Sequence, residues 1–580
     1  MIKTLAKSIR EYTKDSLLAP IFVTLEVIIE VIIPFIMSDL IDDGIYAGHM
    51  PTIVKLGLCL LLFAFLSLLC GAISGKYAAS ASAGFAKNLR HDMYYTVQDF
   101  SFSNIDKFST SSIVTRLTTD VTNLQNAYQM IIRIAVRAPV MFAFSLIMTF
   151  RINPSMTLIF ACVIPVLLVG LGLIMYFVRP LFEKVFKAYD SLNLVVQENV
   201  RGIRVVKSFV REPYETQKFD KMSGSIYRLF TKAEKIMASA TPLMQFIVYA
   251  CMLLISWFGA KIIITTNMTE LTTGQLTSLI TYTMQILMSL MMLAMVFVMI
   301  TMSRASAERI CEILTEQSDL TDKDQPVLSV KDGAVTFHNV DFSYSKDANK
   351  LCLSGVNLDI RSGETIGIIG GTGSSKTSLV QLIPRLYDVT AGSVLVGGVD
   401  VRDYDITSLR NAVAMVLQKN VLFSGTITEN LKWGKEDASM EEIVRACQLA
   451  QADDFIRKFP DGYDTYIEQD GSNVSGGQKQ RLCIARALLK KPKILILDDS
   501  TSAVDTSTDA LIRKAFREEI PDTTKIIIAQ RIASIEDADK IIVLDNGKIN
   551  AMGTHEELLS SNAIYQEVYN SQGKGGEDHA

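Results

Sequence analysis

One short stretch of the chain carries the residue types that bind phosphate groups. An apolar run, Thr365–Ile369, leads into a glycine-rich turn, and Lys376 and Thr377 follow before a helix-like segment. Glycines let backbone N–H groups point inward at phosphate oxygens, the lysine reaches the outer phosphates, and the hydroxyl binds Mg²⁺. The spacing therefore predicts a nucleotide-phosphate loop made of Gly370, Gly371, Thr372, Gly373, Ser374, Ser375, Lys376, Thr377 and Ser378.

The alternative for this stretch is a strand–helix turn that binds no ligand. Ser375 favours that alternative, because glycine is expected directly before the lysine. A second group of residues supports the phosphate loop. Ile494–Leu497 form a buried apolar strand that ends in Asp498 and Asp499. In that order, Asp498 is placed to bind Mg²⁺ and Asp499 to orient or activate an attacking water.

A second anion site is predicted near Asn473–Arg481, where small residues open the helix-like run Leu482–Leu489. Two phosphate-binding helix starts, far apart in one chain, suggest that two chains share each nucleotide. Tyr344 precedes the first phosphate loop and could stack on a base; a tyrosine of the core or the surface is the alternative.

These motifs occupy only the second half of a chain of 580 residues, which is too long for one domain. Hydrophobic residues make up 49% of the chain, and mean hydropathy is +0.27, with the excess in the N-terminal half. A helix that crosses a lipid bilayer needs about 20 mostly apolar residues. Six stretches qualify: Leu17–Met37, Val54–Gly75, Ile131–Phe150, Met156–Val178, Ala240–Ile264 and Gln275–Met302.

Basic residues predict the orientation of these spans. Lys and Arg gather in two long loops, 79–130 and 179–239, and are scarce in the short loops. Both termini and both long loops are therefore expected in the cytoplasm, and the long loops should continue the spans as helices. From Val327 onward, strands and helices alternate as in an α/β domain.

The overall charge and the cysteines argue against a nucleic-acid-binding protein and against a metal or disulfide framework. The net charge of −4 gives no basis for a nucleic-acid partner. The eight cysteines lack metal-binding spacing, and we interpret them as free thiols.

Charged residues inside the spans need partners. Glu26 and Glu30 lie four residues apart, as do Arg133 and Arg137, so each pair shares one face of its helix. We hypothesise that the two faces pair. A site for a polar or cationic substrate is one interpretation, and an ion-pair clamp between helices is the favoured one.

Methionines form a stripe on the sixth span. They recur in steps of three and four, which places them on one helix face, and flexible thioether chains adapt to varied apolar ligands. Ordinary packing or lipid contact is the alternative. The stripe consists of Met284, Met288, Met291, Met295, Met299 and Met302.

In their order along the chain, these motifs resemble those of the ATP-binding cassette exporters of the multidrug type, over almost the full length. The resemblance implies a membrane all-α six-helix transmembrane domain of the type-1 exporter fold. An α/β P-loop nucleotide-binding domain with an antiparallel β subdomain and an α-helical subdomain follows. We place the transmembrane domain at 1–312, a linker at 313–334, the ATP-binding domain at 335–570 and a disordered tail at 571–580.

The resemblance also implies roles for single residues, with ATP and Mg²⁺ as ligands. Tyr344 matches the adenine-stacking aromatic, Asp498 the Walker B aspartate, and Gln418 the loop residue that senses Mg²⁺. The signature matches Ser475, Gly476, Gly477 and Gln478, with Val474 where leucine is usual. Ser502–Asp505 match the loop that crosses the dimer interface, and the segments Ser103–Lys107 and Gln197–Lys207 look like coupling elements.

Three residues depart from the family pattern, and all lie on the site built from this chain's own phosphate loop. Asp499 stands where the family has a catalytic glutamate; its carboxylate is one methylene shorter, and such a misplacement lowers the rate about 10²-fold. Gln530 replaces the switch histidine and cannot become cationic or relay a proton. Ser375 is the third departure.

We therefore predict a multi-pass protein of the cell membrane that uses ATP to export small amphipathic or hydrophobic compounds. In this prediction the chain pairs with a second half-transporter, whose site hydrolyses ATP, while its own site is degenerate. A homodimer with slow hydrolysis at Asp499 and an ATP-gated regulatory membrane protein that does not pump are the alternatives.

Overall fold

The structure, a computed structural model, describes residues 1–347, 349–500 and 502–577, which form two units. The helical unit comprises Met1–Gln98 and Ser111–Thr315. The α/β unit comprises Asp99–Thr110 and the chain from Glu316 onward. Each unit is described by itself.

The helical unit is built from long helices. In the described part of the chain, six helical stretches are long and apolar enough to cross a membrane, and each contains one of the six predicted spans. The helices are α1 (Ile2–Ala6), α2 (Thr13–Asp39), α3 (Met50–Gln98), α5 (Thr110–Thr115), α6 (Val121–Ile152), α7 (Pro154–Arg201), α8 (Ile203–Ser208), α9 (Glu212–Met237), α10 (Ala240–Thr265) and α11 (Thr273–Thr315).

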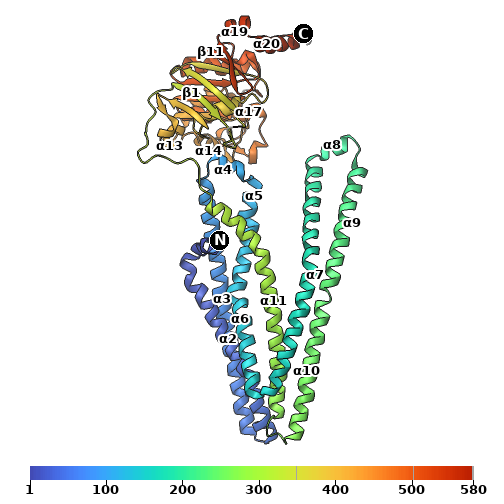
Figure 1. The fold of residues 1–580 in the computed structure, drawn as a ribbon. Coiled ribbons are helices and arrows are strands. Elements are labelled where there is room, and N and C mark those ends of the chain that lie inside the picture. The colour runs from blue at the N-terminus through green and yellow to red at the C-terminus, as the bar shows by residue number, and fades with distance from the viewer. Residues whose placement is uncertain (348, 501, 578–580) are drawn as a thin grey trace. The chain divides into compact units, whose positions relative to one another are not determined.

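Several of these helices exceed the thickness of a bilayer. At 1.5 Å per residue, the 49 residues of α3 extend roughly 74 Å, against about 30 Å of hydrocarbon. The long loops are therefore helical continuations of the spans, as the sequence predicts. Within the unit, α2 packs against α3 and α6, and α6 against α11. The helices α7 and α9 run side by side, with α8 at the end of their hairpin (Figure 1).

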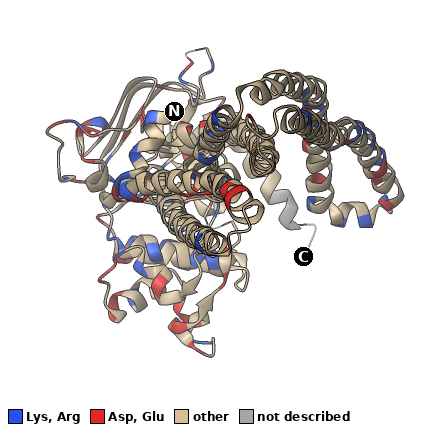
Figure 2. Cartoon of the chain, turned by 90° about the horizontal axis from the view of Figure 1, so that it is seen from below, with Lys and Arg blue, Asp and Glu red and all other residues tan. Residues whose placement is uncertain are grey.

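Apolar side chains cover the outside of these helices. Leu61, Leu68 and Trp257 are 69%, 69% and 75% exposed, and long uncharged stretches of these helices alternate with charged bands (Figure 2). Contiguous exposed apolar surface of this kind fits contact with lipid. All eight cysteines are free thiols.

The α/β unit contains two principal sheets. An antiparallel sheet has the order β2-β1-β4-β5, and a six-stranded sheet has the order β12-β11-β3-β10-β9-β6. Their strands are β1 (Val335–Phe342), β2 (Leu353–Ile360), β3 (Thr365–Ile369), β4 (Ala391–Val396), β5 (Val399–Asp400), β6 (Val413–Val416), β9 (Ile494–Asp498), β10 (Thr524–Ile528), β11 (Lys540–Asp545) and β12 (Lys548–Gly553). The short pair β7 (Gly425–Thr426) and β8 (Tyr466–Ile467) lies apart from them in the topology.

Helices complete the α/β unit. They are α4 (Phe102–Lys107), α12 (Lys376–Gln381), α13 (Ile406–Ala412), α14 (Ile427–Lys432), α15 (Met440–Leu449), α16 (Asp453–Ile456), α17 (Gly476–Leu489), α18 (Thr506–Glu519), α19 (His555–Ser561) and α20 (Ala563–Glu577). Of these, α14, α15 and α17 pack on one another and form the helical subdomain.

The order of the large sheet explains where its loops meet. The neighbours β3, β10, β9 and β6 are parallel, and β9 and β10 are buried along their whole length. The carboxyl ends of parallel strands share one edge of a sheet, and the loops that follow them gather there. Gly370, Gln418, Asp499 and Gln530 all lie just beyond those ends.

Helix α20 continues to Glu577, and residues 578–580 lie outside the described residues. The disorder expected of the tail from Ser571 stays a prediction. The helix is anchored by Tyr565, whose side chain is fully buried, and its later turns extend that anchored helix. Composition alone does not reveal such an anchor.

Candidate functional site

A cavity of about 540 Å³ lies at the edge of the large sheet. The structure brings together in it the predicted residues from the phosphate loop and from three strand ends. Its lining includes Tyr344, Gly370, Gly371, Thr372, Gly373, Ser374, Ser375, Lys376, Thr377, Ser378, Gln418, Asp498, Asp499 and Gln530. The signature residues Ser475–Gln478 are outside this lining. Sequence reasoning missed Cys352 and Val568, which also line the cavity and carry no motif.

The phosphate loop is folded around its own lysine. Lys376 Nζ donates hydrogen bonds of 2.8 Å to the carbonyl oxygens of Gly370 and Gly371, and one of 3.2 Å to Ser374 Oγ. Burial lowers the pKa of Lys376, and the charges of Asp498 and Asp499 oppose this shift. The ammonium group thus sits among weak acceptors that phosphate oxygens can replace.

Backbone geometry constrains two positions of this loop. A Cβ at Gly370 would lie 2.1 Å from the carbonyl oxygen of Leu544, so only glycine fits there. Ser375 adopts a left-handed conformation with φ of 70°, which glycine tolerates better than serine. The departure at Ser375 is therefore accommodated in this fold with some backbone strain.

Asp498 has the surroundings of a metal ligand. Its side chain is 2% exposed, and its Oδ2 atom has no hydrogen-bond partner among the described residues. Burial raises the pKa of Asp498, and a hydrogen bond with Thr377 opposes the rise. A buried carboxylate oxygen without a partner, beside a hydroxyl, fits a hard cation that prefers oxygen ligands. Thr377 and Asp498 therefore fit Mg²⁺.

Further protein ligands for that ion are few. In the part of the chain that the structure describes, no group of three or more His, Cys, Asp or Glu side chains gathers as a metal site. Magnesium in nucleotide sites commonly takes one or two carboxylates and completes its shell with phosphate and water oxygens.

Asp499 is held between two neutral amides. Its Oδ2 atom accepts a hydrogen bond of 2.6 Å from Gln530 Nε2 and a longer one of 3.4 Å from Gln418 Nε2. Burial raises the pKa of Asp499, and the bonds from Gln418 and Gln530 oppose the rise. Two departures from the family pattern, Asp499 and Gln530, thus contact each other directly.

Tyr344 lines the cavity, and the residue is 46% exposed, as access of a base to its ring requires. Its hydroxyl is 2.9 Å from Ser378 Oγ and donates to Gln381 Oε1. The ring of Tyr387 meets it edge-on at 5.1 Å, and the Tyr387 hydroxyl donates a 2.6 Å bond to Asp106 of α4. Tyr387 has no motif in the sequence, whereas Asp106 lies in the predicted coupling segment Ser103–Lys107.

The segment Ser103–Lys107, predicted as a coupling element, forms α4 and belongs to the α/β unit. Lys107 pairs with Glu316 at 2.7 Å, and Ser103 donates a 2.7 Å bond to Asp319. The segment therefore bonds to the chain that connects α11 to the sheets. The other predicted coupling segment, Gln197–Lys207, spans the end of α7 and most of α8.

The signature begins helix α17. Ser475 Oγ accepts from the Gln478 N–H, and the Gln478 side chain accepts from the Ser475 N–H, a reciprocal cap. A Cβ at Gly477 would lie 2.8 Å from the Ala503 carbonyl oxygen, and the Ala503 N–H donates to Gln480. The signature helix thus braces the loop Ser502–Asp505.

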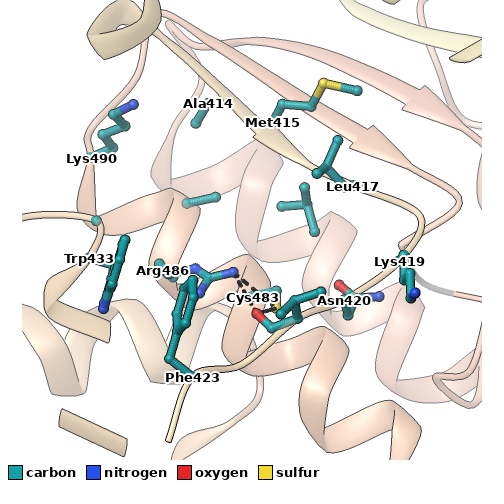
Figure 3. A pocket seen from close by; sticks show the side chains of 14 residues that line it. Ala414, Met415, Leu417, Lys419, Asn420, Phe423, Trp433, Cys483, Arg486 and Lys490 are labelled. Atoms are coloured by element: carbon teal, nitrogen blue, oxygen red, sulfur yellow. Dashed lines mark hydrogen bonds between the residues drawn. The ribbon is translucent and has the colours of Figure 1, made fainter. Parts of the chain in front are cut away.

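A second cavity of about 380 Å³, which the sequence does not predict, lies beside Gln418. Phe423 and Trp433 stack there with ring centroids 4.3 Å apart, and Arg486 donates to the Val421 carbonyl oxygen (Figure 3). Leu417 and Lys419, the neighbours of Gln418, line it. It forms an open, largely apolar groove on the α/β unit.

In the helical unit, the hypothesised charge pairing forms through one arginine. Arg137 donates to Glu26 Oε1 at 2.5 Å and to both oxygens of Glu30 at 2.6 and 2.8 Å. Arg133 makes no ion pair with either glutamate in the described structure. The pairing therefore involves three of the four predicted residues.

The methionine stripe lies on an exposed face of α11. Met288 and Met295 are 56% and 60% exposed, and Met284, Met291 and Met302 are also exposed, while Met299 is half-buried. The opposite face of α11 packs within the unit through Tyr282, Ile286 and Leu290.

Comparisons with known proteins cover both units. Residues 16–305 match the family model described as "ABC transporter transmembrane region", and residues 353–502 match "ABC transporter". The ABC transporter ATP-binding protein YfiB of Bacillus subtilis is 35% identical over 97% of each chain. The ATP-dependent lipid A-core flippase of Desulfotalea psychrophila is 33% identical over 84% of each.

A solved structure, a bacterial Atm1-family ABC exporter with ATP bound, is similar to the chain with a TM-score of 0.82. It is 25% identical, and the match covers 97% of this chain and 99% of that one.

Proposed function

Because the chain belongs to the ABC transporter family, with the fold of the exporters, we propose that it is the degenerate half of a heterodimeric exporter. ABC exporters of this fold function as dimers. In this proposal the chain binds ATP at its own site, hydrolyses it slowly, and completes the partner's site with Ser475–Gln478.

The bond between Gln530 and Asp499 carries the proposal. A general base must accept a proton from water, and a switch residue must stabilise the charge that develops on the terminal phosphate. Here the carboxylate oxygen of Asp499 already accepts hydrogen bonds from two amides, and neither amide can take up a proton. The pair suits the holding of a nucleotide better than its rapid hydrolysis.

Residues of the cavity take the other roles in ATP binding. Tyr344 stacks on the adenine, Lys376 and the backbone N–H groups of the phosphate loop hold the phosphates, and Thr377 and Asp498 hold Mg²⁺. When bound, Mg²⁺ neutralises charge on the β- and γ-phosphate oxygens.

Closure of two ATP-binding domains would then be passed to the spans through α4 and α8. The contact of Asp106 with Tyr387, a neighbour of Tyr344, supports a role for α4. Exposed apolar side chains on and beside α8, at Ile203, Val205 and Phe209, support docking of this helix on a partner. The concentration of basic residues in the long loops supports a cytoplasmic ATP-binding domain.

Hydrolysis by the chain alone tests the proposal. In lipid, the chain by itself should hydrolyse Mg-ATP slowly and should lose little activity in Asp499→Asn. Lys376→Ala should abolish nucleotide binding in the same preparation. When a second half-transporter is co-purified, activity should rise and should depend on the partner's glutamate.

A homodimeric exporter is the second candidate, because Asp499 is an intact carboxylate that lines the cavity. It predicts robust turnover by this chain alone, with a loss of about 10²-fold or more in Asp499→Asn. That result would replace the heterodimer proposal.

We further propose that the substrate is amphipathic. The exposed methionines of α11 support a soft, apolar lining, and the likeness to a lipid A-core flippase supports an amphipathic molecule. Met288→Leu with Met295→Leu should change the range of transported compounds, whereas Met141→Leu, at a buried position on α6, should not. Unchanged transport of every compound in the double variant would contradict the lining.

For Arg137 we propose a clamp between α2 and α6. Removal of one partner of a buried ion pair destabilises by about 3–5 kcal/mol, so Arg137→Met should lower thermal stability. Exchange of charges in Glu30→Arg with Arg137→Glu should restore it. Intact stability with altered transport in Arg137→Met would instead indicate a substrate site.

A further inference from the structure

The C-terminal helix α20 contributes to the nucleotide cavity along one face. Tyr565 is fully buried, and its hydroxyl lies 2.7 Å from His555 Nδ1. Val568, three residues on, lines the cavity, and Gln572 follows four residues later. Steps of three and four place the three side chains in one stripe of a helix. The stripe joins the core of the unit to the edge of the nucleotide site.

Gln572 bonds to both ends of a short backbone segment, Gln530–Ile532, which we call the switch loop. Its Nε2 atom donates to the Gln530 carbonyl oxygen at 2.7 Å, and its Oε1 atom accepts from the Ile532 N–H at 2.9 Å. Ile532 opens a short 3-10 turn, Ile532–Ser534, so its N–H has no acceptor within that turn. One side-chain amide thus serves two backbone groups.

The sheet does not hold the switch loop by itself. The last backbone hydrogen bond from this end of β10 to β3 runs from the Ala529 N–H to the Ile368 carbonyl oxygen. The next residue, Gln530, lies beyond the strand. Gln572 supplies the bond that follows. The Gln530 side chain points into the cavity and donates to Asp499. The position of the Gln530 side-chain amide therefore depends on the backbone to which Gln572 bonds.

We propose that Gln572 is a positioning residue for the switch loop, and that it holds the Gln530 amide where the terminal phosphate of ATP binds. This inference rests on the proposed function and adds one premise, that the Gln530 amide donates a hydrogen bond to that phosphate. Gln572 does not touch the nucleotide itself. Its loss should therefore weaken the binding of ATP, which has the terminal phosphate, and spare ADP, which lacks it.

The test compares ATP and ADP binding by the full-length protein in lipid nanodiscs, with a non-hydrolysable ATP analogue in place of ATP. Gln572→Ala removes both hydrogen bonds and should weaken binding of the analogue about threefold to tenfold, with ADP affinity unchanged within about twofold. Gln572→Glu keeps the acceptor for the Ile532 N–H and loses the donor. Its affinity for the analogue should therefore lie between those of the parent protein and Gln572→Ala.

Gln566→Ala is the matched control. Gln566 lies on the same helix and donates a similar 2.8 Å bond to a backbone oxygen, that of Leu559, away from the switch loop. It should change neither affinity. The inference would be overturned if Gln572→Ala lowered the affinities for the analogue and for ADP equally. It would also be overturned if the preference for the analogue stayed as in the parent protein.

Gln530→Ala separates the two levels of the argument. If Gln530→Ala lowers the preference for the analogue and Gln572→Ala does not, only the positioning role of Gln572 fails. If Gln530→Ala leaves the preference unchanged, the proposed contact of Gln530 with the terminal phosphate fails, and the role of Gln572 fails with it.

Discussion

The α/β unit carries two helix starts that are suited to phosphate, and their backbones differ. Before α12, Ser375 is left-handed with φ of 70°, and no side chain caps the helix. Before α17, Ser475 is extended with φ of −68°, and a reciprocal cap with Gln478 completes the turn. The first start is strained and lies among the departures from the family pattern. The second is relaxed and nearly intact.

The difference teaches which parts of a nucleotide site can change. Gly370 is required by packing, because a Cβ there would meet the Leu544 carbonyl oxygen. Ser375 needs only a left-handed backbone, which costs a residue other than glycine about 1–2 kcal/mol. Asp499 and Gln530 satisfy each other by a hydrogen bond. The cavity therefore persists while three of the side chains that line it depart from the family pattern.

The largest expected effect comes from the second helix start, the signature residues Ser475–Gln478. In the proposed heterodimer, Ser475→Arg should lower ATP hydrolysis about 10²–10³-fold, because a large side chain would replace the hydroxyl proposed to bind the partner's ATP. Asp499→Asn in the same complex should change the rate of ATP hydrolysis less than about twofold, because the proposal assigns rapid hydrolysis to the partner's site. Hydrolysis in lipid measures both.

Ser472→Arg serves as the control, since Ser472 is exposed three residues before the signature and bonds to Glu468. It should leave turnover near that of the parent. Equal losses in Ser475→Arg and Asp499→Asn would erase the contrast between the two halves.

The next effect restores the altered half. Asp499→Glu together with Gln530→His should raise hydrolysis at this chain's own site by about 10²-fold, because the longer carboxylate reaches the attacking water and the imidazole can become cationic. Single-turnover hydrolysis with the partner's site inactivated measures it. Each single replacement should gain less, and no gain in the double variant would mean that other residues limit the site.

A smaller effect tests the strain at the first helix start. Ser375→Gly should raise the free energy of unfolding by about 1 kcal/mol, because glycine adopts a left-handed φ without a steric penalty. Thermal unfolding monitors the change. Asn546→Gly, at φ of 45° in another turn, is the control for nucleotide binding, which this replacement should leave unchanged. An unchanged or lower melting temperature in Ser375→Gly would show that the serine side chain contributes a favourable contact.

The smallest effect concerns α4, the proposed coupling helix. Burial raises the pKa of Asp319, but hydrogen bonds from Lys346, Ser101 and Ser103 outweigh it and bring the pKa to about 2. Because this pKa lies below the value of about 3.9 for an unfolded aspartate, the contact contributes its full stability above about pH 4 and loses it as the pH falls toward 2.

Hydrogen exchange of α4 between pH 5 and 2.5 follows this loss, with Asp319→Asn as the control that lacks the titration. Equal pH dependence in the parent and in Asp319→Asn would contradict the assignment.

Much of the fold and of the site could be predicted from local patterns. The six spans follow from runs of apolar residues, and the phosphate loop and the strand end at Asp498 follow from glycine spacing and strand pattern. The gathering of Gln418, Asp499 and Gln530 in one cavity follows from the parallel strands β6, β9 and β10. Gln572 could not be predicted, because its role depends on a contact across 42 residues of chain, and a lone glutamine in a polar tail has no pattern.

The sequence by itself determined which chemistry the chain can carry: the phosphate loop, the signature, the spans and the three departures are all residue types at local spacing. Only the tertiary structure decided which partners those residues choose. It selected Arg137 rather than Arg133 for Glu26 and Glu30, paired Asp499 with Gln530, and brought Asp106 to Tyr387. Spacing along the chain specifies the face of a helix or the end of a strand, whereas a side-chain contact depends on how distant elements pack.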